Sequence, residues 1–259
     1  MTAARGVVLL AAGSGQRMRP LTDHCPKALL PLPGDEAGRT VLDSLVEAVR
    51  SRSDGEIVVV TGFAADAVQR HLRRRHGAAV RCVHNARWAE DVNIGSVACG
   101  VDALRTRAGG YLIVETDLLL DGTAWDGLFD ALQAGEDSFW VTHGVYGPQR
   151  TGGVVHAGAD GWIDVVDYRP VHDGACDGWP KMLGMLAVGA REVAADVALR
   201  AAAMRRTLNQ YYLMPWKHGM PPLRARVLPL DAGHAGTFNT PAEFDAACRA
   251  WQQRLALAA

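Results

Sequence analysis

The chain has 259 residues and a formal net charge of −1, so its overall charge gives no attraction to nucleic acid or to an anionic membrane surface. Hydrophobic residues make up 49% of the chain, which is enough for a sizeable buried core. No apolar run reaches the roughly 18 residues that a membrane-spanning helix needs. We therefore expect a globular protein that binds neither nucleic acid nor membrane.

The five cysteines stand at positions 25, 82, 99, 176 and 248, and none belongs to a Cys-x-x-Cys pair. This spacing predicts neither a zinc site nor a disulfide framework. Arg5 is followed only by a short apolar segment and then by glycine and charge, which does not match a signal peptide. We expect a cytoplasmic protein.

The first half of the chain alternates between strand and helix patterns. In chain order, we expect strands at Gly6–Leu10, Glu56–Thr61, Ala79–Val83 and Tyr111–Val114, and helices around Val41–Val49 and over Ala65–Arg75 and Ile94–Arg105. Strands separated by helices indicate βαβ crossovers, and hence a mostly parallel sheet with helices on both faces. Ligands bind beyond the carboxyl ends of such strands. The loops after Leu10, Thr61 and Val114 should therefore share one rim.

The pattern changes after about Asp137, where short apolar runs are separated by Gly, Pro and Asp clusters. These runs favour antiparallel strands, at Ser138–Val145, Val154–His156 and Trp162–Val166. A helix over Ala190–Arg206 and a late strand over Ala225–Leu228 should follow. The sequence Thr240-Pro241-Ala242-Glu243 is a capping box with proline at the first helical position, so a final helix should run to about Leu255.

The most informative motif follows the first predicted strand. It reads Leu9-Leu10-Ala11-Ala12-Gly13-Ser14-Gly15-Gln16-Arg17-Met18-Arg19-Pro20-Leu21-Thr22, with Pro26-Lys27 shortly after. A glycine-rich turn leaving a strand exposes backbone N–H groups that can cradle a polyphosphate. Arg17 and Lys27 add two positive charges. The motif lacks the Gly-Lys-Ser/Thr of a P-loop, and Met18 stands where a dinucleotide fingerprint needs its third glycine. Phosphate chemistry on a nucleotide is indicated.

The spacing Gly-x-Gly-x-Arg-Met-x-Pro-Leu-Thr, with Pro-Lys three residues later, resembles the signature of the nucleotidyltransferases that make nucleoside diphosphate sugars, CDP-choline and related compounds. This resemblance is close over residues 9–27, moderate to about residue 120 and thin afterwards. It implies an α/β, Rossmann-like fold, the nucleotide-diphospho-sugar transferase fold, with a small antiparallel subregion on the acceptor side. We expect one domain over residues 1–259, with a nucleotide-binding half at about 1–136, an acceptor-side half at about 137–240 and a C-terminal helix at 241–259.

Nucleotidyl transfer is an in-line attack on the α-phosphorus in which pyrophosphate leaves, so the protein has to position two polyanions and neutralise their charge. We assign Arg17 to the β- and γ-phosphates, and Lys27 to the α-phosphate or the incoming oxyanion. The expected nucleotide-binding residues are Leu10, Ala11, Ala12, Gly13, Ser14, Gly15, Gln16, Arg17, Thr61, Gly62, Asn93 and Ser96.

Two polyanions cannot approach each other unscreened, so a divalent ion is expected, and oxygen ligands favour Mg²⁺. Asp117, just after the Tyr111–Val114 strand, resembles the family's metal-binding aspartate; the alternative is that it caps the following turn. Family members usually carry a second aspartate shortly before the last helix, where this chain has Asn239. An asparagine carbonyl can bind Mg²⁺ but adds no charge, and Asp231 is a possible substitute.

The segment Asn93-Ile94-Gly95-Ser96 resembles the Asn-Ile-x-Ser element of cytidylyltransferases that activate phosphocholine or phosphonates. The preference for cytosine follows from this resemblance. The alternative is that Asn93 and Ser96 simply cap a helix. By family analogy, backbone groups around Ala11–Gly13 and Thr61–Phe63 would contact the base.

The acceptor-binding residues are expected to be Lys27, Glu115, Arg150 and Lys181. Glu115 resembles a neighbour of the metal-binding aspartate in the choline-phosphate and phosphonate branch. Tyr211, Tyr212, Trp216 and Lys217 form a cluster that could be an acceptor wall or a dimer contact. They do not form a clear aromatic box for a quaternary amine, so a small phosphonate is favoured over phosphocholine.

The sequence thus predicts a CTP-dependent cytidylyltransferase that uses Mg²⁺, transfers CMP to a small phosphonate or to phosphocholine, and releases pyrophosphate. Candidate phosphonates are phosphonoformate, 2-hydroxyethylphosphonate and 2-aminoethylphosphonate. One alternative is a sugar-1-phosphate nucleotidyltransferase. Another is a non-catalytic nucleotide-binding regulator, which Asn239 favours and which Arg17, Lys27 and Asp117 oppose. Monomer and homodimer both stay open.

Overall fold

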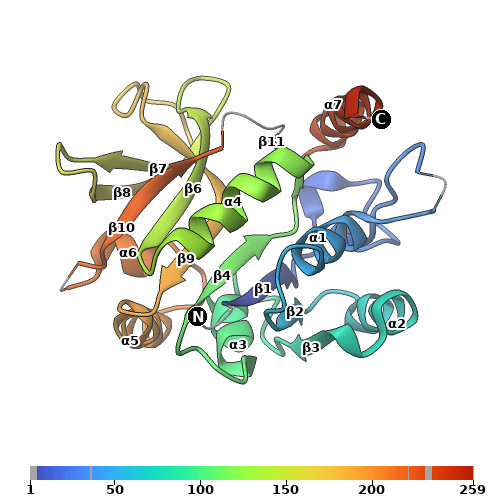
Figure 1. Cartoon of the computed structure of the whole chain (residues 1–259), viewed down its shortest axis with the longest axis horizontal. Helices are drawn as coiled ribbons and strands as arrows, with labels where there is room; N and C mark the ends of the chain where they lie inside the picture. The colour runs from blue at the N-terminus through green and yellow to red at the C-terminus, as the bar shows by residue number, and fades with distance from the viewer. Residues whose placement is uncertain (1–4, 36, 221, 231–234, 259) are drawn as a thin grey trace.

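The computed structural model describes residues 5–35, 37–220, 222–230 and 235–258, and at residues 235 and 254–258 it describes the backbone alone. Its largest element is a nine-stranded sheet (Figure 1). Along the main path of this sheet the strands are β10 (Ala225–Pro229), β6 (Ser138–Val145), β9 (Pro180–Gly189), β4 (Gly110–Glu115), β1 (Gly6–Ala11), β2 (Ile57–Thr61) and β3 (Val80–His84).

Strand β1 lies between β2 and β4 and runs parallel to both. In the register of this ladder, Leu10 lies opposite Glu115 on one side and opposite Val60 on the other. All six residues of β1 are buried, as expected for a central strand covered on both faces. The carboxyl ends of β1, β2 and β4 therefore meet at one rim, which confirms the predicted arrangement of the three loops.

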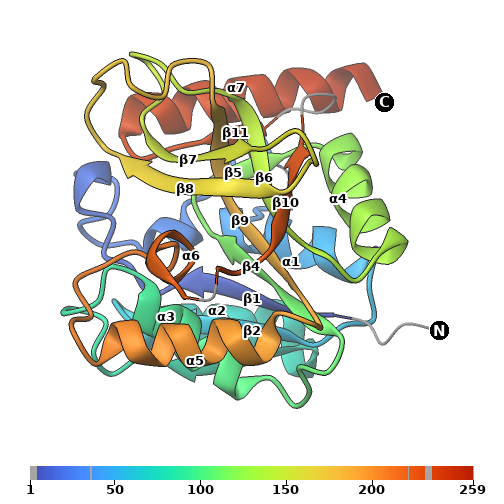
Figure 2. The same ribbon diagram turned by 90° about the vertical axis from the view of Figure 1, so that its left-hand side faces the viewer.

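Helices cover both faces of the sheet. They are α1 (Val41–Arg50), α2 (Ala65–His76), α3 (Ile94–Ala103), α4 (Gly122–Ala134), α5 (Val193–Met204), α6 (Met214–His218) and α7 (Pro241–Ala258). Successive side chains of β1 point to opposite faces: Val7 and Leu9 pack with α1, α2, α4 and α7, whereas Val8 and Leu10 pack with α3, α5 and α6. Figure 2 shows α3 and α5 on one side of the sheet and α4 and α7 on the other. Among the helices described, none is long and apolar enough to cross a membrane.

Two smaller β elements lie off this main path, and the first of them supplies the remaining two strands of the nine-stranded sheet. Strands β7 (Gly152–Ala157) and β8 (Ile163–Arg169) form an antiparallel hairpin, which joins β9 where Val154 pairs with Lys181. Strands β5 (Leu118–Leu120) and β11 (Ala235–Thr237) form a separate antiparallel pair. Because Asp117 and Asn239 flank this pair, it brings the end of β4 next to the start of α7.

The predicted α/β class, the mostly parallel sheet and the small antiparallel part are confirmed. The boundaries differ at several ends: α3 stops at Ala103, α5 begins at Val193 and β8 covers 163–169. Sequence reasoning missed α4, α6, the β5–β11 pair and above all β9. Strand β9 pairs antiparallel with both β4 and β6, so β6 belongs to the main sheet. Glycine at position 184 and the scarcity of β-branched residues concealed this strand.

The buried Asp43 carboxylate joins α1 to α2. It accepts hydrogen bonds from the Thr40 backbone N–H at 2.9 Å, from His71 Nε2 at 2.9 Å and from His76 Nε2 at 2.7 Å. Burial alone would raise the pKa of Asp43, but the hydrogen bonds from His76, Thr40 and His71 outweigh it and hold this pKa well below its usual range.

Asp43→Asn is therefore expected to lower the free energy of unfolding by about 2–4 kcal/mol at pH 7. The substitution removes a buried charge that accepts hydrogen bonds from Thr40, His71 and His76. A carboxylate with a lowered folded-state pKa stabilises fully above its unfolded pKa of about 3.9, and this stability is lost as the pH falls further. The difference between wild type and variant should thus shrink in acid. Urea unfolding from pH 7 to about pH 3 measures it. The control is Asp130→Asn, which changes an exposed aspartate of α4.

Candidate active site

The loop after β1 is shaped by Gly15 and anchored by Met18. Gly15 adopts a left-handed conformation (φ 64°), and its carbonyl accepts hydrogen bonds from Met18 N and Thr22 Oγ1, both at 2.8 Å. A Cβ at Gly15 would lie 3.3 Å from Lys27 Cβ. Met18 is completely buried, while Gly13 and Arg17 are exposed. The loop thus holds Arg17 and Lys27 beside an open glycine turn.

Four predicted site residues meet at this rim: Arg17, Lys27, Asp117 and Asn239. Lys27 Nζ lies 3.0 Å from Asp117 Oδ2 and 3.5 Å from Asn239 Oδ1. One Arg17 guanidinium nitrogen donates to Asn239 Oδ1 at 2.7 Å. The structure therefore brings the predicted phosphate-binding cations together with both predicted metal-binding residues, although they come from three distant parts of the chain.

The capping box of α7 positions Asn239. Glu243 Oε2 accepts from the backbone N–H groups of Asn239 (2.6 Å) and Thr240 (3.1 Å), and Thr240 Oγ1 accepts from Glu243 N at 3.3 Å. The preceding Phe238 N–H donates to the Asp117 carbonyl at 2.9 Å. The alternative was that Asp117 caps the following turn; its carboxylate instead accepts a hydrogen bond from Lys27 Nζ, and Asp121 caps the next helix, α4. The other metal candidate, Asp231, lies outside the described residues.

On the α3 side of the rim, Glu115 and Asn93 form a second polar cluster. Asn93 Nδ2 donates to Glu115 Oε1 at 3.0 Å, and Asn93 Oδ1 accepts from the Tyr212 backbone N–H at 2.8 Å. Burial raises the pKa of Glu115 to about 8; Asp117 adds to this shift, and Lys27 and Lys181 oppose it. Although Asn93 stands at the N-cap of α3, its side chain makes no cap hydrogen bond.

The Ser96 side chain forms hydrogen bonds with Asp91 and Asn85. Asp91 Oδ2 accepts from both the N–H (2.7 Å) and the hydroxyl (2.8 Å) of Ser96, whose Oγ also accepts from Asn85 Nδ2 at 3.0 Å. Asp91 is therefore the residue that caps α3, a role that the spacing of Asn93 and Ser96 concealed. The Thr61 side chain is also used internally, since its hydroxyl donates to the Val83 carbonyl at 3.3 Å.

The predicted acceptor residue Lys181 lies on β9, where its backbone pairs with Val154 of β7. Burial lowers its pKa, Glu115 and Asp117 act in the opposite direction, and Arg150 lowers it further. Its ammonium donates to the Met182 carbonyl at 2.8 Å. Arg150 is exposed in the turn between β6 and β7, where it donates to the His143 carbonyl at 3.4 Å.

The aromatic cluster divides between core and surface. Tyr212 and Trp216 are buried, and both pack on Trp140, with ring centroids 5.6 and 6.0 Å away. Tyr211 is half-buried and its hydroxyl accepts from Tyr168 at 2.7 Å. The Lys217 ammonium pairs with Asp167 of β8. Tyr212 and Trp216 are thus core residues, which leaves Tyr211 as the aromatic residue of this cluster nearest to an open surface.

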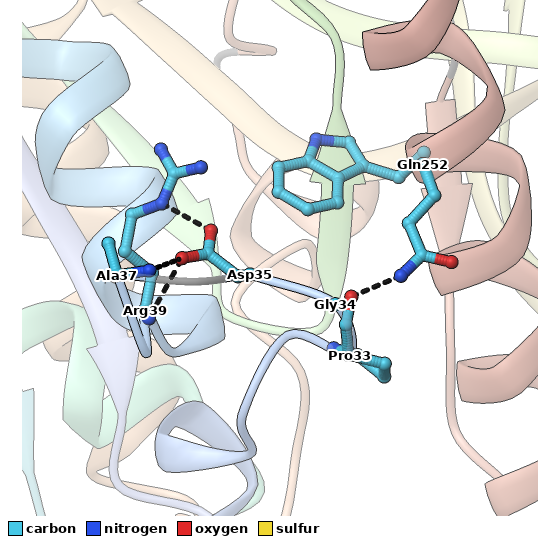
Figure 3. A pocket seen from close by; sticks show the side chains of 7 residues that line it. Pro33, Gly34, Asp35, Ala37, Arg39 and Gln252 are labelled. Carbon is cyan, nitrogen blue, oxygen red and sulfur yellow. Dashed lines mark hydrogen bonds and ion pairs between the residues drawn. The ribbon is translucent and has the colours of Figure 1, made fainter.

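Two pockets lie away from the rim. One, of about 500 Å³, opens between residues 33–35, 37 and 39 and α7. There Arg39 pairs with Asp35, and the Gln252 side chain donates to the Pro33 carbonyl (Figure 3). The other, of about 640 Å³, lies between α3, α5 and residues 205–208. The predicted site residues line neither of these two pockets.

Residues 7–159 match the MobA-like NTP transferase domain. The chain belongs to this family. Over 113 residues it is 36% identical to 2-aminoethylphosphonate cytidylyltransferase of Lancefieldella rimae, an alignment that covers 44% of this chain and 43% of that protein. Over 157 residues it is 32% identical to N-acetylmuramate alpha-1-phosphate uridylyltransferase of Caulobacter vibrioides, with 60% and 52% covered. The chain thus spans about half the length of these curated relatives.

Solved nucleotidyltransferase structures share the fold. The CTP:phosphocholine cytidylyltransferase of Streptococcus pneumoniae superposes with a TM-score of 0.76 and 16% identity, over 94% of this chain and 97% of that one. The inositol-1-phosphate CTP transferase of T. maritima gives a TM-score of 0.71 and 14% identity, over 93% and 91%. The predicted recognition and fold class are therefore confirmed.

The contact between the loops after β1 and β2 requires glycine at position 62. Phe63 N donates to the Ala12 carbonyl at 2.9 Å, and a Cβ at Gly62 would lie 2.6 Å from that carbonyl oxygen and 2.5 Å from Trp88 Cβ. Gly62→Ala should therefore cost about 1–3 kcal/mol of unfolding free energy, measured by urea denaturation. Gly13→Ala is the control: a Cβ there meets nothing within 4 Å, so stability should stay within about 0.5 kcal/mol. Equal stabilities of the two variants would contradict the required close approach.

Proposed function

We propose that this protein is a CTP-dependent cytidylyltransferase that transfers CMP to a small phosphonate or phosphate monoester and releases pyrophosphate. The observation that carries the proposal is the convergence of Arg17, Lys27 and Asp117 at the carboxyl ends of β1 and β4. The similarity to a 2-aminoethylphosphonate cytidylyltransferase, and to the choline-phosphate cytidylyltransferase of Streptococcus pneumoniae (28% identical over 90 residues, 35% of this chain and 36% of that protein), supports cytosine as the base.

In the proposed reaction the acceptor oxygen attacks the α-phosphorus in line, the bond to the bridging oxygen breaks, and pyrophosphate leaves with the electron pair. The exposed Arg17 guanidinium can form paired hydrogen bonds to the β- and γ-phosphates. Lys27, of whose side chain only 14% is exposed, presents a point charge nearer the α-phosphate. In this proposal, the backbone N–H groups of Gly13 and Ser14 would cradle the leaving group.

The residues present fit a magnesium ion with few protein ligands. Mg²⁺ commonly binds through one or two carboxylates together with substrate phosphates and water. Asp117 offers such a carboxylate at the centre of the site, and the described residues contain no group of three or more His, Cys, Asp or Glu side chains able to hold a metal without substrate. When bound, the ion would neutralise charge on the phosphates.

The acceptor would lie on the β9 side, between Lys181 and Glu115. Lys181 would bind its phosphonate or phosphate group, and Arg150 stands farther out toward solvent. Candidate acceptors are phosphonoformate, 2-hydroxyethylphosphonate, 2-aminoethylphosphonate and phosphocholine. A sugar 1-phosphate is the second candidate class, favoured by the similarity to a uridylyltransferase that is 32% identical over 157 residues.

Pyrophosphate release with each common NTP and each of these acceptors tests the proposal. We expect turnover with CTP and a phosphonate. Lys27→Met should lower kcat/KM by about 10²–10³-fold, as expected for removal of one charge-stabilising donor. Arg74→Met, which removes an exposed charge from α2, should leave kcat/KM unchanged. Turnover only with a sugar phosphate and another NTP would establish the second candidate class. CTP binding without any turnover would favour the non-catalytic regulator.

Lys181→Met separates the acceptor site from the nucleotide site. We expect the KM for the acceptor to rise about tenfold, since one charged contact to a phosphonate is lost, while the KM for CTP stays within about twofold. Initial-rate kinetics with each substrate varied in turn measures both constants. An equal rise in both would place Lys181 outside the acceptor site.

A further inference from the structure

The Asn239 side chain has an unusual position for a neutral group. Its single carbonyl oxygen accepts from two cations, Arg17 at 2.7 Å and Lys27 at 3.5 Å. The amide orientation is fixed by this contact, because the alternative would turn the NH₂ group toward two positive charges. The backbone of Asn239 is held as well, through the Glu243 carboxylate. The residue is therefore rigidly placed between the two cations.

The charge balance of the cluster follows from this neutral residue. Arg17 and Lys27 contribute two positive charges, Asp117 contributes one negative charge at 3.0 Å from Lys27, and Asn239 contributes none. One positive charge is left over, and Arg17, the exposed cation, is paired with an amide instead of a carboxylate. An amide orients a guanidinium without cancelling its charge, so Arg17 stays available to an anion.

We propose that Asn239 is a positioning residue that makes the rim a metal-independent binding site for polyphosphate, a polyphosphate trap. Asn239 holds Arg17 and Lys27 side by side without neutralising their charges. A triphosphate therefore binds before a divalent cation does, and also binds in its absence. This inference rests on the proposed assignment of the triphosphate to these two side chains. It also assigns Asn239 to the cations and not to the metal, which Asp117 would hold together with the phosphates.

The trap is tested with inorganic tripolyphosphate, which has neither base nor acceptor, so the outcome does not depend on whether the enzyme uses CTP. Isothermal titration is carried out with EDTA and again with Mg²⁺. We expect the wild type to bind tripolyphosphate in EDTA. Asn239→Asp should weaken that binding at least about tenfold, because a carboxylate beside two cations competes with the ligand. Asn209→Asp, which adds the same charge between α5 and α6, should have no effect.

Mg²⁺ distinguishes positioning from a structural defect. Asn239→Asp creates a second carboxylate beside Asp117, so Mg²⁺ should restore tripolyphosphate binding to within about threefold of the wild type. In the opposite direction, Asp117→Asn removes the charge that partly neutralises Lys27 and should tighten metal-free binding several-fold while abolishing the effect of Mg²⁺. Thermal unfolding confirms that each variant is folded.

Three results would overturn the trap: wild type that binds tripolyphosphate only with Mg²⁺, an Asn239→Asp variant that binds it as tightly as wild type in EDTA, or a loss of binding that is the same with and without Mg²⁺. None of these depends on the nucleotide or acceptor used in turnover. Failure of the cytidylyltransferase proposal would instead appear as absent or different turnover alongside intact tripolyphosphate binding.

Discussion

The placement of β1 between β2 and β4 is the constraint on which the rest of the molecule depends. Every side chain of β1 is buried against helices on one face of the sheet or the other. None of these side chains can therefore reach a ligand in solvent. Functional groups must come from the loops where the parallel strands end, and these loops share one rim. The parallel ladder, with Leu10 opposite Glu115, determines how closely the ends of β1 and β4 meet.

At the rim, Arg17 and Lys27 share Asn239 as a hydrogen-bond acceptor, and Lys27 also pairs with the Asp117 carboxylate. Lys27 contacts both Asp117 and Asn239, and Asn239 in turn orients Arg17. On the other side Asn93 links Glu115 to the backbone of Tyr212, so a polar contact ties the end of β4 to the segment before α6. The two clusters meet at Glu115, whose raised pKa reflects its burial and the nearby charge of Asp117. Preorganised cations beside a single carboxylate are suited to receiving a polyanion.

The sequence predicts the site best where neighbouring residues act together. The loop from Leu10 to Lys27 is a continuous motif, because its glycine turn, its buried Met18 and its two cations all serve one local geometry. The acceptor side was harder to predict. Lys181 and Arg150 were visible as isolated cations, but only the tertiary structure shows that Lys181 is half-buried within electrostatic reach of Glu115 and that Arg150 lies at the surface. Ser96, predicted to bind nucleotide, donates a hydrogen bond to Asp91, a partner five residues away that its motif did not reveal.

The sequence alone determined the α/β alternation, the glycine-rich loop after β1 and the choice of Arg17, Lys27 and Asp117 as candidate site residues, because periodicity, glycine turns and fixed charges are local properties. The tertiary structure decided which of these residues meet. Strand β9 enters antiparallel beside β4, and the β5–β11 pair carries the start of α7 to the end of β4; both depend on contacts between segments far apart in the chain. The place of Asn239 between two cations is a product of that packing, since residues more than 200 positions apart become neighbours only when the sheet is complete.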